Sequence, residues 1–144
     1  MKRISIVSGY FNPIHVGHIN LFKKAKEISD FLIVIVNNDK QAKLKTGFVF
    51  MPELERMEII KAIRYVDEAF LSIDGDRSVV KSLEQIFGKH PKHDFIFANG
   101  GDREKNNIPE AEICKKLGIK IIDEVGGGKV QSSSWLLKNI KDKI

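Results

Sequence analysis

The chain has 144 residues and a formal net charge of +5, which suits a polyanionic ligand but comes without an RNA-recognition or zinc-finger signature. No apolar run approaches the roughly 20 residues of a membrane-spanning helix, and Met1-Lys2-Arg3 leads into a short strand rather than a signal peptide's apolar core. We expect one cytoplasmic domain over residues 1–144, without a membrane or nucleic-acid partner.

Apolar runs of strand length alternate with segments of helical period along the chain. The predicted strands are Arg3–Ser8, Phe31–Val36, Tyr65–Ser72, Asp94–Ala98 and Ile119–Glu124. The predicted helices are Val16–Ile28, Pro52–Ile63, Arg77–Phe87, Pro109–Leu117 and Ser132–Ile140. The segment Asp39–Met51 is predicted to be a long loop carrying Lys40, Lys43 and Lys45, either as a cover for a bound anion or as solvated surface.

The second and fourth predicted strands are nearly continuous in apolar residues, which is typical of a parallel sheet covered on both faces. The predicted fold class is therefore α/β, a Rossmann-like doubly wound five-stranded parallel sheet with helices on both faces. Ligands of such folds bind outside the carboxyl ends of the strands, where the strand order reverses. The single cysteine, Cys114, lies on the apolar face of its predicted helix, so we expect it in the core.

The junction after the first strand reads Ser-Gly-Tyr-Phe-Asn-Pro-Ile-His-Val-Gly-His over residues 8–18. Backbone amides near Gly9–Phe11 and the start of the next helix can point at a phosphate. His15 and His18 are three residues apart, so both imidazoles can lie on one side of the first helical turn. Helix capping and packing by the two histidines is the alternative, and a zinc site is less favoured because His90 and His93 lie elsewhere.

Residues 9–18 resemble the G-x-F-[DN]-x-x-H-x-G-H signature of the HxGH nucleotidylyltransferases, in the branch that contains glycerol-3-phosphate cytidylyltransferase and the adenylyltransferase domain of ADP-heptose synthase. Further segments in matching order extend the resemblance over nearly the whole chain: residues 52–56, 63–68, 99–102 and 131–134. The resemblance implies transfer of a nucleotidyl group from a nucleoside triphosphate, with release of pyrophosphate. It also implies a homodimer or larger homo-oligomer.

Carried over residue by residue, the resemblance assigns catalytic roles to His15, His18, Lys45 and Arg56, with Lys43 as an alternative to Lys45. Arg56 would lie near the phosphates or the acceptor, whereas a surface ion pair with Glu53 or Glu55 is its alternative. The implied nucleotide-binding residues are Gly9, Tyr10, Phe11, Asn12, Gly101, Asp102, Ser132, Ser133 and Ser134. Mg²⁺ is implied with the triphosphate, and no protein-only metal cage is predicted.

The substrates stay open at this point. Asn12, and Gln131 with serines where cytidylyltransferases place an arginine and threonines, leave CTP and ATP as alternatives. A sugar phosphate or glycerol 3-phosphate is the favoured acceptor, with FMN, phosphopantetheine and phosphoethanolamine as alternatives. A nucleotide-binding regulatory protein without turnover is the competing hypothesis from another functional class.

Overall fold

The computed structural model describes residues 2–100 and 108–123. Five strands form one parallel sheet in the order β3-β2-β1-β4-β5. The strands are β1 (Arg3–Gly9), β2 (Phe31–Val36), β3 (Glu68–Leu71), β4 (Asp94–Ala98) and β5 (Lys120–Ile122). The helices are α1 (Val16–Glu27), α2 (Asp39–Thr46), α3 (Glu53–Lys61), α4 (Val80–Lys89) and α5 (Ala111–Leu117). The predicted Rossmann-like fold class is thus confirmed.

The strand order reverses at β1, which pairs with β2 on one side and β4 on the other. The register aligns Ile4 with both Phe31 and Phe95, so the carboxyl ends of β1 and β4 lie at the same edge of the sheet. In open parallel sheets this point leaves a crevice for ligands. Gly9, the last residue of β1, opens the loop that lines it.

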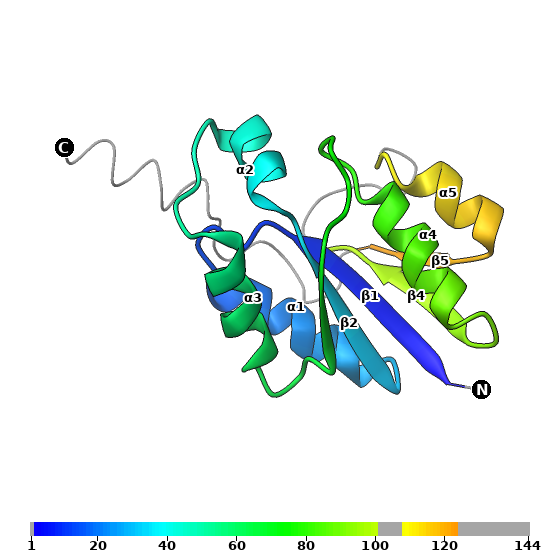
Figure 1. Ribbon diagram of the computed structural model, residues 1–144. Coiled ribbons are helices and arrows are strands. Elements are labelled where there is room, and N and C mark those ends of the chain that lie inside the picture. Colours follow the sequence, from blue (N-terminus) through cyan, green and yellow to red (C-terminus); the bar gives the residue numbers. More distant parts are fainter. Residues whose placement is uncertain (1, 101–107, 124–144) are drawn as a thin grey trace.

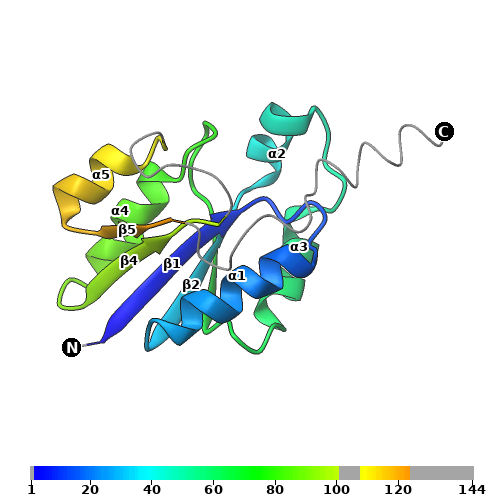
Figure 2. The same cartoon turned by 180° about the vertical axis from the view of Figure 1, so that it is seen from behind.

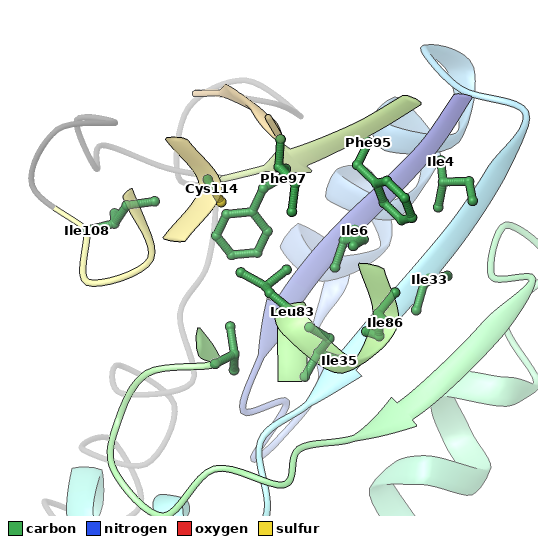
Figure 3. Close-up of a cluster of buried hydrophobic side chains, with 12 residues drawn as sticks. Ile4, Ile6, Ile33, Ile35, Leu83, Ile86, Phe95, Phe97, Ile108 and Cys114 are labelled. Carbon is green, nitrogen blue, oxygen red and sulfur yellow. The ribbon is translucent and has the colours of Figure 1, made fainter. Parts of the chain in front are cut away.

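Apolar side chains cover both faces of the sheet, as continuous apolar strands require. One helix pair, α4 and α5, packs on one face, and the other pair, α1 and α3, packs on the opposite face (Figures 1 and 2). The core under α4 and α5 contains Leu83, Ile86 and Cys114 from these helices. They pack on the residues of β1, β2 and β4 that point to this face of the sheet (Figure 3). Cys114 is therefore a core residue, and burial together with nearby Glu110 raises the pKa of its thiol to about 12.

The segment predicted as the Asp39–Met51 loop instead begins with a helix, α2, and this prediction was wrong. Asn38 and Gln41 form a reciprocal capping box at its start, and Gly47 ends it in the left-handed conformation at φ 87°. These local signals outweigh the weak apolar periodicity of the segment.

Other predicted boundaries shift by a few residues. The third strand is shorter than predicted, and the helix predicted from Arg77 begins at Val80, after a hydrogen-bonded turn. The predicted helix Ser132–Ile140 lies outside the described residues. Within residues 2–100 and 108–123, no helix has the length and apolar character needed to cross a membrane.

Candidate functional site at the end of the first strand

The turn after β1 is built around a buried aromatic ring. A Cβ atom at Gly9 would lie 2.7 Å from two ring atoms of Phe11, so only glycine fits there. Phe11 has a left-handed backbone, with φ 53°, and its ring is 1% exposed. The ring packs edge-on against His18 and Phe22, with centroid distances of 4.8 and 5.5 Å. This packing fixes the loop that carries the two histidines at the sheet edge.

His15 and His18 lie side by side at the start of α1. The Nδ1 atom of His15 accepts a hydrogen bond from the Gly17 N–H at 3.1 Å, and Nδ1 of His18 accepts from the His15 N–H at 3.1 Å. Their rings are stacked with centroids 3.7 Å apart. Because both Nδ1 atoms act as acceptors, each neutral ring carries its proton on Nε2. Capping and phosphate binding are therefore compatible, since capping fixes the tautomer that donates from Nε2.

The environment keeps His18 uncharged at neutral pH. Burial is the main cause, and electrostatic interactions with His15 and Lys45 act in the same direction; together they lower the pKa of its imidazole to about 3. A neutral imidazole with an Nε2 proton donates a hydrogen bond without the cost of burying a second charge.

This lowered pKa predicts a loss of stability at acid pH. The unfolded chain binds the His18 proton near pH 6.5 and the folded chain near pH 3. The contribution of neutral His18 to the unfolding free energy is therefore fully present above pH 6.5, and it is lost as the pH falls from 6.5 toward 3. We expect the wild type to lose about 2 kcal/mol more unfolding free energy between pH 7.5 and 5 than His18→Asn, measured by urea denaturation. Equal losses in the two proteins would show that His18 is not buried in its neutral form.

Lys45 is brought to the same loop by the last turn of α2. Its ammonium lies 4.3 Å from the centroid of the Tyr10 ring, and its positive charge contributes to the lowered pKa of His18. Lys43 and Lys45 are both exposed residues of this turn, and it is the ammonium of Lys45 that lies over the Tyr10 ring. Of the two lysines that the sequence left open, the structure therefore brings Lys45 against residues 10–18, the histidine loop.

Arg56 is 1% exposed, so the alternative of a surface ion pair was wrong, while its role near the phosphates or the acceptor stays a prediction. Its Nε donates to the Met51 carbonyl at 2.8 Å, Nη1 donates to the carbonyls of Tyr10 and Asn37, and Nη2 pairs with the Asp39 carboxylate at 2.7 Å. The ion pair is thus with Asp39, not with Glu53 or Glu55. These donors bind protein oxygens, so Arg56 holds together the loop after β1, the junction of β2 with α2, and the start of α3.

Asn12 bridges the histidine loop to the segment before α3. Its Oδ1 accepts a hydrogen bond from the Met51 N–H at 2.7 Å, which fixes the orientation of the amide. The side chain is 2% exposed, and its Nδ2 is buried without a hydrogen-bond partner in the described part of the chain. An aspartate at position 12 would place a second acceptor oxygen where asparagine has the Nδ2 donor. Asparagine therefore suits a hydrogen-bond acceptor next to Nδ2.

Several implied nucleotide-binding residues lie outside the described ranges: Gly101, Asp102, Ser132, Ser133 and Ser134. Just before them, Asn99 follows β4 and is 8% exposed, and its Nδ2 has no hydrogen-bond partner among residues 2–100 and 108–123, a feature that sequence reasoning missed. Asn38 and Gln41 were also missed, although an asparagine three residues before a glutamine is a recognisable helix-start signal.

Metal ligation by the protein has little support from the described residues. They contain no group of three or more histidine, cysteine, aspartate or glutamate side chains that could hold a metal ion. His90 and His93 precede β4 and therefore lie at the opposite edge of the sheet from His15. An Mg²⁺ ion that arrives with a triphosphate needs few protein ligands, because phosphate and water oxygens fill most of its coordination sphere.

Together, the two Nε2 donors and the Lys45 ammonium form an array that can bind an anion. The array lies beyond the carboxyl end of β1, where the fold leaves its crevice. It offers donors and positive charge but no side chain placed as a nucleophile. Such an array suits stabilisation of charge on a reacting phosphate.

Comparison with known proteins gives consistent matches. A family model described as cytidylyltransferase-like matches residues 6–122. An FAD synthase of Pyrococcus abyssi is 39% identical over 117 residues, which cover 81% of this chain and 74% of that protein. The bifunctional protein HldE of Desulfatibacillum aliphaticivorans is 28% identical over 98% of this chain but only 27% of its own length. A crystal structure of the lipopolysaccharide core biosynthesis protein from Thermoplasma volcanium superposes with a TM-score of 0.69 at 26% identity, over 85% of this chain and 96% of that one.

Proposed function

This chain belongs to the cytidylyltransferase-like family and is a nucleotidyltransferase, and we propose that it transfers AMP from ATP to FMN, forming FAD and pyrophosphate. The observation that carries the choice of substrates is the identity of 39% with an FAD synthase over most of both chains. The stacked donors of His15 and His18 beside Lys45 supply the charge stabilisation that the transfer needs.

In the proposed reaction, a phosphate oxygen of FMN attacks the α-phosphorus of ATP. The bond from that phosphorus to the bridging oxygen breaks, and pyrophosphate leaves. Because FMN attacks directly, no covalent protein intermediate forms. Negative charge on the α-phosphate and on the leaving pyrophosphate is stabilised by hydrogen bonds from Nε2 of His15 and His18 and by the Lys45 ammonium. Mg²⁺ bound to the triphosphate would neutralise further charge.

Two exposed aromatic side chains next to this site favour an acceptor with a flat ring. Phe48 and Phe50 are 38% and 46% exposed on the segment between α2 and α3. That segment is tied to the histidine loop by the hydrogen bond between the Met51 N–H and Asn12. The large flat isoalloxazine ring of FMN can stack on aromatic side chains over its whole face, which gives it more contact area there than the small ring of a sugar phosphate. The aromatic pair therefore supports FMN over the smaller acceptors.

A sugar phosphate is the second candidate acceptor. The match to the bifunctional protein HldE spans 98% of this chain, and a solved structural relative carries the description of a lipopolysaccharide core biosynthesis protein. Both candidates use the same chemistry at the α-phosphate, so the acceptor alone distinguishes them.

The test is pyrophosphate release from each of the four common nucleoside triphosphates, with FMN, a sugar 1-phosphate or glycerol 3-phosphate as acceptor. We expect release with ATP and FMN to exceed every other combination by at least about 100-fold, a ratio within the range that differential binding provides. Phe50→Ala should raise the KM for FMN and leave the KM for ATP unchanged. Release with a sugar 1-phosphate but not with FMN would replace the proposed acceptor, and triphosphate binding without any release would favour a regulatory protein.

A further inference from the structure

Polar contacts, rather than an apolar face, hold α2 against the rest of the domain. It lies beyond the carboxyl end of β2, apart from the helices that cover the sheet (Figure 1). Its buried residues are Gln41 and Ala42, and its largest apolar side chain, Leu44, is 55% exposed. Short helices of globular proteins are normally held by an apolar stripe. The position of α2 therefore depends on a small number of hydrogen bonds.

Asn38 forms the first of these links. Its Oδ1 caps the helix by accepting from the Gln41 N–H at 2.9 Å. Its Nδ2 donates both protons to backbone carbonyls after β3, to Ser72 at 3.0 Å and to Asp74 at 2.9 Å. The same amide thus starts the helix and ties it to the segment 72–78.

Gln41 forms the second link in the same way. Its Oε1 accepts from the Asn38 N–H at 3.0 Å, which completes the capping box. Its Nε2 donates to the carbonyls of Asp76 at 2.7 Å and Ser78 at 2.8 Å, and the side chain is 0% exposed. Every donor and acceptor of both amides is therefore used, which sets the orientation of the helix and not only its start.

The segment that receives these bonds is itself anchored. The Asp74 carboxylate is 4% exposed and accepts from the N–H groups of Lys81 and Ser82 at 2.8 and 3.0 Å. The Ser82 hydroxyl donates to the same carboxylate at 2.6 Å. Segment 72–78 is thereby fixed to the first turn of α4, so α2 is bound to a rigid part of the domain.

At its other end, α2 presents Lys45 to the histidine loop, with the ammonium 4.3 Å from the Tyr10 ring centroid. We propose that Gln41 and Asn38 are positioning residues, which place Lys45 against the phosphates of the bound triphosphate. This proposal rests on the proposed nucleotidyl transfer, in which Lys45 contacts phosphate oxygens. Neither amide touches the substrate; both act through the orientation of α2.

A double-mutant cycle in kinetics tests the proposal. Gln41→Met removes the two donors and keeps the side-chain length, and we expect it to lower kcat by roughly 10- to 100-fold with a smaller change in KM for ATP, because misplacing a reacting group slows the chemical step. In a Lys45→Met background the same change should cost nothing further in kcat, because the residue through which it acts is already lost. A purely structural role would give the full additional loss in the double variant, and that result would overturn the proposal.

A ligand-free measurement separates this proposal from the choice of substrate. The Tyr10 ring should shift the Lys45 side-chain resonances upfield in NMR spectra of the wild type. We expect this shift to disappear in Gln41→Met while the core methyl spectrum stays native, whatever the acceptor proves to be. Retention of the shift would contradict the proposal, even if FMN is confirmed as the acceptor.

A matched control and a second variant complete the design. Leu44→Ala changes an exposed side chain of the same helix and should leave both the shift and kcat unchanged. If Gln41→Met does not fold, Asn38→Asp takes its place, because aspartate keeps the helix cap and loses both donors to segment 72–78. It should reproduce the loss of the Lys45 shift and the non-additive kinetics, and wild-type behaviour in this variant would contradict the proposal.

Discussion

Replacing His18 by alanine is expected to lower kcat by about 10²- to 10³-fold, the usual effect of removing one donor from a developing oxyanion. The same change should also reduce the unfolding free energy by about 1 kcal/mol, because Nδ1 of His18 caps the His15 N–H and its ring packs on Phe11. Steady-state kinetics and urea denaturation of the same preparations measure the two effects.

Two further substitutions separate the two nitrogens of the ring. His18→Asn keeps an acceptor near the position of Nδ1, so it should restore stability but not turnover. His18→Gln places an amide N–H near the position of Nε2, so it should restore part of the turnover. The reverse pattern, with activity following the helix cap, would show that His18 acts only as a packed residue.

Arg56→Met is expected to produce the largest loss of stability, about 3–5 kcal/mol, because it leaves the Asp39 carboxylate unpaired and removes donors from three backbone carbonyls. Three chain segments, residues 10, 37–39 and 51–56, meet at this guanidinium, so activity should fall along with stability. Urea denaturation followed by circular dichroism gives the difference in unfolding free energy.

The control for Arg56 is Arg64→Met. Arg64 is exposed, and its guanidinium lies 5.2 Å from the Tyr65 ring centroid, so its loss should change stability by less than about 0.5 kcal/mol. If Arg56→Met proved as stable as Arg64→Met, the buried network would not hold the site, and a direct role at the phosphates would again be favoured.

The fold could be predicted because each strand carries its own signal. Continuous apolar runs such as Phe31–Val36 require cover on both faces, and that requirement leads to helices on both sides of a parallel sheet. The helix α2 could not be found from apolar periodicity, because its buried contacts are the amide of Gln41 and the methyl group of Ala42. Its capping box and Gly47 were the available signals.

The candidate site was predictable where its residues are close in sequence. The three-residue spacing of His15 and His18 predicted that the rings share one side of a helical turn, and the rings are stacked. Contacts between distant segments could not be predicted. Asn12 and Met51 are 39 residues apart, and the burial of Arg56 depends on carbonyls from two other segments. Such roles follow from the tertiary arrangement, to which local spacing gives no access.

The most direct test of the proposed function is ³¹P NMR of the protein mixed with ATP, FMN and Mg²⁺. We expect the phosphate signal of FMN to be replaced by the diester signals of FAD, with an equal amount of pyrophosphate, and His18→Asn to slow both changes by about 10²- to 10³-fold. Conversion of ATP to AMP or ADP with FMN unchanged, or FAD formation by His18→Asn at the wild-type rate, would contradict the proposed function.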